Sequence, residues 1–242
     1  MGPEPRGAGE IGAAGVPVSG AYPAITLRVA AEAAGCGLLT FLIVAAGLLA
    51  ERQGGSIALA VLITALAGAA AFLVLTRALS PWAVSGFNPA LAFALILSGR
   101  MDLVTGILSA AAQIAAAFLG VMLAHLVTNT GLVQVATQIQ TGTGVWTGEF
   151  LGTGLFVLAM LSLTARGREA LIPLTGALAL LAISLATPSL CFANPALTLA
   201  RSLTDSFTAI RLADAAAIAG VQCLAALGAW LLHLWLSPQR ED

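Results

Sequence analysis

Long apolar stretches alternate with short polar segments along the whole chain. The apolar stretches fall at about 26–50, 57–79, 102–127, 146–165, 170–187 and 212–236. A transmembrane helix needs about 20 mostly apolar residues to cross a hydrocarbon core of about 30 Å. The stretch at 170–187 is the shortest, and it is still close to that length. The pattern therefore predicts six membrane-spanning helices.

Composition supports the same class of protein. Of the 242 residues, 59% are hydrophobic and 9% are charged, whereas soluble domains carry about 25% charged residues. We therefore expect an all-α, multi-pass membrane protein. The net charge of −1 gives no reason to expect a nucleic-acid partner. The three Cys and two His show no metal-ligand spacing, so we expect no metal site and no other cofactor.

Two polar triplets interrupt this apolar pattern. They are Asn88-Pro89-Ala90 and Asn194-Pro195-Ala196. Asn is a favoured helix N-cap residue, and Pro is favoured at the first helical position. The triplets therefore predict short helices at 88–98 and 194–204. At about 1.5 Å per residue, each would reach roughly half-way across the hydrocarbon core, as a re-entrant half-helix does.

Each triplet alone has a simpler explanation, since Asn-Pro is also an ordinary turn pair. Two copies in apolar surroundings, each continuing with Ala-Leu, favour the re-entrant interpretation. Irregular backbone at mid-membrane depth is tolerated only where it is buried in protein or lines a wet cavity. We therefore expect the two Asn-capped ends to meet near the membrane centre.

The chain also divides into two similar halves. The first repeat is expected at 25–127 and the second at 146–236, with a connecting loop at 128–145 between them. Three spans in each half give the halves opposite orientations, an inverted repeat. Residues 1–24, rich in Gly, Pro and Ala, are expected to be a disordered tail, and 237–242 a short C-terminal tail.

The arginines indicate the orientation in the membrane. With the N-terminus in the cytoplasm, seven of the ten arginines face or adjoin the cytoplasm and three lie outside. The positive-inside rule therefore predicts cytoplasmic termini at both ends. Because the sequence carries no organelle signal, a bacterial inner (plasma) membrane is the default expectation.

Matched polar residues lie inside the predicted spans. Glu32 and Glu149 open the first and fourth spans, and Gln113 and Gln222 lie in the third and sixth. Intramembrane carboxylates are rare and usually functional. We expect both Glu residues to accept hydrogen bonds from the re-entrant loops, whose backbone donors must be satisfied, and the Gln residues to assist. The alternative is that the carboxylates lie at the interface, in water.

This combination of features resembles the major intrinsic protein family of aquaporins and glycerol facilitators. The resemblance covers about residues 26–236 and rests on the six spans, the inverted repeat, the two Glu residues and the doubled triplet. It implies an aquaporin-like fold, a homotetramer with one pore per subunit, and passage of water or small neutral solutes. It also places Asn88 and Asn194 at the pore centre.

The resemblance further locates the expected selectivity filter. Family spacing places it at Gly68, Ala182, Cys191 and Leu197. Most members have Arg where this chain has Leu197, and none of the four residues is aromatic or charged. A wide, weakly polar filter is therefore expected, suited to glycerol, urea and uncharged metalloid hydroxides as well as water. Phe72, one turn from Gly68, would narrow the pore if the spacing is shifted.

Several alternatives stay open at this point. Arg201, four residues after Leu197, either lines the outer vestibule or extends to the outer interface. The main alternative function is a water-selective aquaporin, and a more remote one is a secondary transporter, since inverted repeats and broken helices also occur there. No nucleophile–base pair suggests an enzyme.

Overall fold

The structure is a computed structural model that describes residues 24–54 and 56–237. It is built from α1 (Ile25–Arg52), α2 (Ile57–Leu79), α3 (Pro89–Leu97), α4 (Leu103–Val127), α5 (Thr143–Ala165), α6 (Ile172–Ala186), α7 (Pro195–Ala200) and α8 (Leu212–Leu236). Two short 3-10 segments, η1 (Glu169–Leu171) and η2 (Arg201–Leu203), precede α6 and follow α7. Among the described residues there is no β-strand. The predicted tails, 1–24 and 237–242, fall almost wholly outside these residues.

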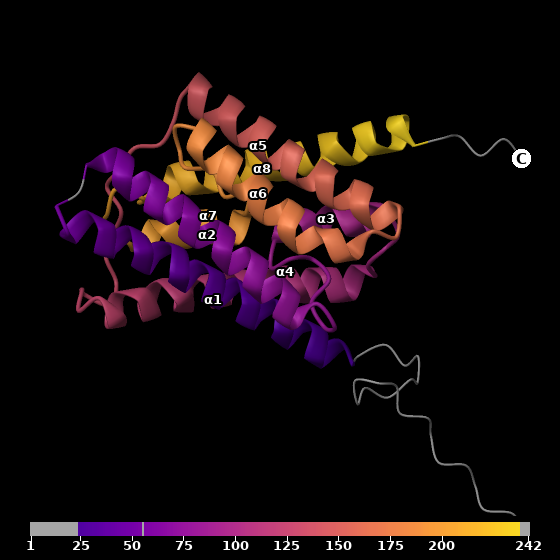
Figure 1. Ribbon diagram of the computed structural model, residues 1–242, viewed down its shortest axis with the longest axis horizontal. Helices are drawn as coiled ribbons and strands as arrows, with labels where there is room; N and C mark the ends of the chain where they lie inside the picture. The colour runs from indigo at the N-terminus through magenta and orange to yellow at the C-terminus, as the bar shows by residue number, and fades with distance from the viewer. Residues whose placement is uncertain (1–23, 55, 238–242) are drawn as a thin grey trace, which may run out of the picture.

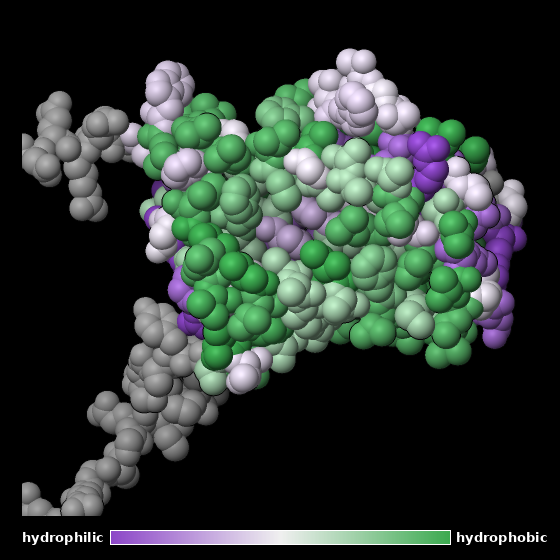
Figure 2. All heavy atoms as spheres, turned by 180° about the vertical axis from the view of Figure 1, so that it is seen from behind, coloured by the Kyte–Doolittle hydropathy of each residue, from purple (hydrophilic) through white to green (hydrophobic). Residues whose placement is uncertain are grey.

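Six helices are long and apolar enough to cross a membrane. They are α1, α2, α4, α5, η1 with α6, and α8, and they contain between 18 and 28 residues. Figure 2 shows an apolar belt over the middle of the molecule, with hydrophilic residues gathered towards its two ends. Large apolar side chains face outwards over this belt, as lipid contact requires. The predicted all-α membrane fold with six spans is confirmed.

The two short helices are the predicted half-helices, and they lie in opposite halves of the bundle. In Figure 1, α1 begins and α8 ends at one end of the bundle, here called the near end. The short helix α3 lies towards that end and α7 towards the opposite, far end. The repeat is therefore inverted. Helix α7 is shorter than α3 because its last turn tightens into η2.

Asparagine caps explain why both half-helices begin where they do. Asn88 has extended backbone, and its Oδ1 accepts a hydrogen bond from the Ala90 N–H at 2.9 Å. Asn194 does the same with the Ala196 N–H at 3.0 Å. Each cap satisfies an N–H group that has no partner within its helix, and Pro follows at the first helical position. The predicted helix starts are confirmed.

Small residues bring α1 and α4 into close contact. A Cβ atom on Gly120 would lie 2.3 Å from the Gly37 carbonyl oxygen, and one on Gly37 would lie 3.0 Å from the Ala116 carbonyl oxygen. Helices in membranes associate through such close backbone approach, because lipid provides no hydrophobic force between them. The α1–α4 contact in turn holds Glu32 and Gln113, one on each helix, next to each other.

Substituting Gly120 tests this contact. We expect Gly120→Val to lower the yield of folded protein and its midpoint of thermal unfolding in detergent, because backbone atoms cannot move aside for the new side chain. Gly154→Val is the matched control, since a Cβ there would meet only the Ala225 carbonyl oxygen, at 4.0 Å. Equal midpoints for the two variants would contradict the expected packing.

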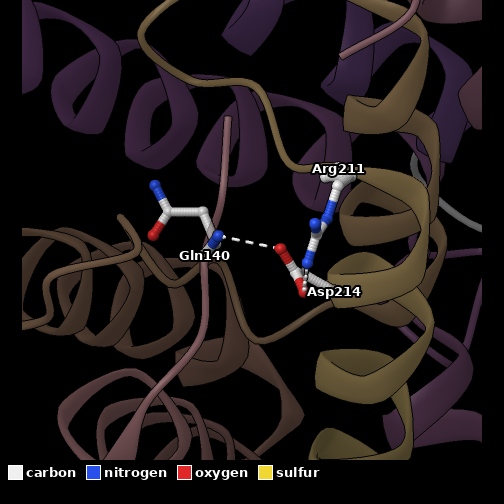
Figure 3. Close-up of polar contacts among 3 residues, drawn as sticks. All are labelled: Gln140, Arg211 and Asp214. Atoms are coloured by element: carbon white, nitrogen blue, oxygen red, sulfur yellow. Dashed lines mark hydrogen bonds and ion pairs between the residues drawn. The ribbon is translucent and has the colours of Figure 1, made fainter. Parts of the chain in front are cut away.

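The loop between α4 and α5 crosses the far end and is bound to the segment after α7. Main-chain bonds join Gln134 N–H to Leu203 O at 3.0 Å and Ala136 N–H to Ser202 O at 3.1 Å. Figure 3 shows the Asp214 carboxylate between the Gln140 N–H, at 3.0 Å, and the Arg211 guanidinium, at 2.9 Å. These contacts fix the loop over the end of the second half-helix.

Candidate pore

The two asparagine side chains are joined by reciprocal hydrogen bonds across the centre of the bundle. Asn88 Nδ2 donates to the Ala193 carbonyl oxygen at 2.7 Å, and Asn194 Nδ2 donates to the Phe87 carbonyl oxygen at 2.9 Å. Both asparagines are 2% exposed. The structure therefore brings together two triplets that lie in different halves of the chain.

An unusual backbone conformation makes these bonds possible. Phe87 and Ala193, the residues before each asparagine, have φ of 61° and 52°. A positive φ is uncommon for residues other than Gly, and it persists only where the surroundings impose it. Here it occurs in the two residues whose carbonyl groups accept from the opposite asparagine. Strain of this kind clusters at functional sites.

Glu32 holds the first re-entrant loop. Its carboxylate accepts hydrogen bonds from the N–H groups of Val84 at 2.7 Å, Ser85 at 2.5 Å and Phe87 at 2.9 Å. Gln113 Nε2 donates to the same carboxylate at 2.9 Å and to the Ser85 hydroxyl at 2.8 Å. Glu32 is completely buried and does not lie at an interface in water.

Glu149 is in the matching place but bonds to different groups. Its carboxylate accepts from the Ser189 hydroxyl at 2.6 Å and from Gln222 Nε2 at 2.8 Å. Gln222 also donates to the Thr198 hydroxyl on α7, at 3.0 Å. Glu32 therefore has the expected backbone N–H partners. The hydrogen bonds described for Glu149 come from side chains instead.

Arg201 is buried and does not extend to the outer interface, as one alternative had it. The side chain is 2% exposed. Its guanidinium donates to the carbonyl oxygens of Ser189 at 2.9 Å, Leu190 at 3.3 Å and Thr208 at 2.5 Å. The carbonyls of the second re-entrant loop and of Thr208 hold it inside, so extension to the interface is wrong.

An aromatic ring occupies the space beside Gly68. A Cβ atom on Gly68 would lie 2.7 Å from Cε1 of Phe192, and the Arg201 guanidinium carbon lies 6.0 Å from the centre of that ring. The structure therefore gathers Gly68, Phe192 and Arg201 in the far half of the bundle. Sequence reasoning missed Phe192, because nothing in the chain indicates which loop residue fills the space at a glycine of α2.

Ala182 is not among the described contacts of Phe192 and Arg201, so its place in the filter stays a prediction. It is exposed, on the same stripe of α6 as Leu178 and Leu185, which are 57% and 48% exposed. Leu180 and Ile183 face the interior instead. Each residue turns an α-helix by about 100°, so a spacing counted through the loop after α6 cannot fix which face points inwards.

Cys191 and Leu197 are both buried close to the second triplet. The Cys191 sulfur accepts from the Ala193 N–H at 3.3 Å and lies 3.2 Å from where a Cβ on Gly152 would be, so it points towards α5. The Leu197 N–H completes the asparagine cap, donating to Asn194 Oδ1 at 3.4 Å. The thiol of Cys191 therefore accepts a hydrogen bond within the second re-entrant loop and packs against α5.

A cavity of about 140 Å³ opens in the half of the bundle that contains α3. Its walls come from α2, the first re-entrant loop, α3, α5 and α6. Arg100 and Glu169, which are exposed, line it together with buried side chains that include Phe72, Leu91 and Met160. The cavity therefore lies beside the loop and the half-helix that Asn88 joins.

Six spanning helices around two re-entrant half-helices with joined caps define a polytopic membrane protein of the channel type. The pattern of the family described as "Major intrinsic protein" matches residues 21–193. A curated relative, "Aquaglyceroporin AqpS" of Rhizobium meliloti (strain 1021), is 35% identical over 214 residues, which cover 86% of this chain and 91% of the relative. The chain belongs to the major intrinsic protein family, as its motifs predicted, and is a membrane channel for small solutes.

Proposed function

We propose that this chain is a passive channel for small neutral solutes, namely glycerol, urea and uncharged metalloid hydroxides, together with water. The observation that carries the proposal is the reciprocal pair of bonds between the Asn88 and Asn194 amides and the opposite loops. The name of the relative, an aquaglyceroporin, favours glycerol over water alone.

The asparagine pair supplies hydrogen bonds to a passing solute. Each side-chain oxygen is used to cap its own half-helix, and one amide proton bonds the opposite loop. An amide nitrogen carries two protons, so the second proton of each asparagine is available for the oxygen of a solute. No bond is made or broken in this process, so neither an enzyme activity nor a cofactor is needed.

Electrostatics disfavours cations along the same path. Each half-helix N-terminus acts as about half a positive charge, and the two face one point. Arg201 adds a full positive charge in the far half, where its described bonds are to carbonyl oxygens. The electrostatic barrier acts on cations and is much smaller for a neutral molecule, so the arrangement favours uncharged solutes.

We place the far constriction at Gly68, Phe192 and Arg201, with Leu197 and Cys191 close by. The ring of Phe192 and the stem of Arg201 provide an apolar wall, and the guanidinium provides donors on one side. Polarity confined to one side allows a solute to leave as readily as it arrives. Glu32 with Gln113, and Glu149 with Gln222, keep the two loops in place.

We infer the assembly and location from the same family. The chain is a homotetramer with one pore per subunit, in a bacterial plasma membrane, with both termini in the cytoplasm. The near end is then the cytoplasmic end, which agrees with the bias of the arginines. The repeats 25–127 and 146–236 each contribute three spans and one half-helix.

Stopped-flow light scattering of proteoliposomes tests the function. We expect the purified protein to raise the permeability to glycerol, urea and arsenite well above that of empty liposomes. We also expect the rates to be unchanged by an imposed proton or sodium gradient, because no coupling step is involved. High water permeability with background glycerol permeability would support a water-selective channel instead, and gradient-dependent flux would support a transporter.

A further inference from the structure

The ring of Phe72 forms part of the wall of the cavity at the near end. This side chain lines the cavity, yet it is only 1% exposed. It extends from α2 and makes an edge contact with Phe156 of α5, with ring centres 5.7 Å apart. The ring therefore lies between the cavity and Phe156.

Glycines flank the ring on two sides. A Cβ atom on Gly176 of α6 would lie 2.2 Å from Cε1 of Phe72, and one on Gly86 would lie 3.5 Å from Cε2. Gly86 belongs to the re-entrant loop, two residues before Asn88. The ring thus fills the gap between α6 and the loop that carries the first asparagine. Its edge lies where a side chain on Gly176 would be.

The cavity beside the Phe72 ring presents hydrogen-bond acceptors next to apolar side chains. The hydroxyl groups of Thr76, Ser80 and Thr164 each donate to a carbonyl of the preceding helical turn, at 2.5, 3.4 and 2.9 Å. Their oxygens therefore keep lone pairs free to accept. Leu91 and Met160 form apolar surface in the same cavity. Acceptors beside apolar wall suit a small polyol, with its hydroxyl protons on one side and its carbons on the other.

We infer that the Phe72 ring is the barrier that selects solutes by size in the near half of the passage, and that the cavity beside it holds a small polyol before it crosses. This inference rests on the proposed channel function. It assigns the size limit for polyols to Phe72 and Gly176, and not to the group around Gly68.

The test compares Phe72→Leu with Phe156→Leu in proteoliposomes, using glycerol, the four-carbon polyol erythritol, and water. We expect Phe72→Leu to raise erythritol permeability about tenfold, as a barrier lower by about 1.4 kcal/mol would, with little change for water. Phe156→Leu removes the same ring volume from a completely buried residue that is not among those lining the cavity. Because its ring only contacts that of Phe72, we expect it to raise the ratio of erythritol to water permeability much less than Phe72→Leu does.

A second variant changes the barrier in the opposite direction. Gly176→Ala pushes the ring towards the re-entrant loop, so we expect lower glycerol and erythritol permeability. The same substitution in Phe72→Leu protein is expected to have little effect, because the two residues are in contact and their effects are not additive. This double-mutant cycle also covers the case in which one single variant folds poorly.

The outcomes separate this inference from the proposed function. Glycerol permeability of the wild-type protein at the level of empty liposomes would contradict the channel function itself. Glycerol-conducting wild-type protein, with Phe72→Leu and Phe156→Leu showing the same ratio of erythritol to water permeability, would contradict the role of Phe72 alone. An equal effect of Gly176→Ala in wild-type and in Phe72→Leu protein would also contradict the role of Phe72.

Discussion

Glu32→Gln is expected to remove most of the folded protein. The carboxylate accepts three backbone N–H groups of the first re-entrant loop and one amide of Gln113. Glutamine replaces one acceptor oxygen with a donor NH₂ group, which then faces donors that cannot rotate. Each buried donor left without a partner costs about 1–3 kcal/mol. Several together amount to a large part of the free energy of unfolding of a typical domain.

Glu149→Gln provides the matched control. The described partners of Glu149 are a serine hydroxyl and a glutamine amide, and both can turn to present an acceptor. We therefore expect a smaller loss for Glu149→Gln. Size-exclusion chromatography and the midpoint of thermal unfolding in detergent measure the difference. A wild-type midpoint for Glu32→Gln, or equal losses for both variants, would contradict the account of the loops.

Arg201→Gln is expected to produce the second large effect, a leak of protons and other cations with glycerol permeability retained. The substitution removes a buried positive charge from the far half, whereas the half-helix N-termini provide only about half a charge each. The rate of proton leak in vesicles that contain a pH-sensitive dye, under an imposed potential, measures the change. We expect Arg201→Lys to leak less than Arg201→Gln, because it keeps the charge but loses the planar fork that bonds several carbonyls.

Arg211→Gln is the control for this measurement. Arg211 is 47% exposed and pairs with Asp214 at the far end, so its charge is largely screened by water. We expect its removal to leave proton leak unchanged. Equal leaks for Arg201→Gln, Arg211→Gln and wild-type protein would show that Arg201 does not exclude cations.

Features of the structure set by local chemistry could be predicted from the sequence. Apolar length gives the spans, and the Asn-Pro pairs give the starts of both half-helices to the residue. The burial of Glu32 and Glu149 also follows from local context, because carboxylates within apolar helices need internal partners. Each of these predictions depends on residues within one turn or one span.

Features that depend on the rotation of helices could not be predicted. Counting back from Asn194 to Ala182 crosses a loop whose positive φ at Leu190 and Ala193 no single sequence reveals. The count alone therefore cannot fix which face of α6 turns towards the filter, and Ala182 is exposed. For the same reason the sequence did not indicate that Phe192 fills the space at Gly68, or that Arg201 turns inwards to the loop carbonyls.

The central claim is that two asparagines face one continuous passage, and glycerol influx into proteoliposomes with Asn88→Asp and Asn194→Asp tests it most directly. Aspartate keeps the oxygen that caps each half-helix but removes the amide that donates to the opposite loop and to the solute. The account predicts that either substitution alone reduces glycerol influx nearly to that of empty liposomes in protein that still folds. Wild-type influx in either variant would contradict it.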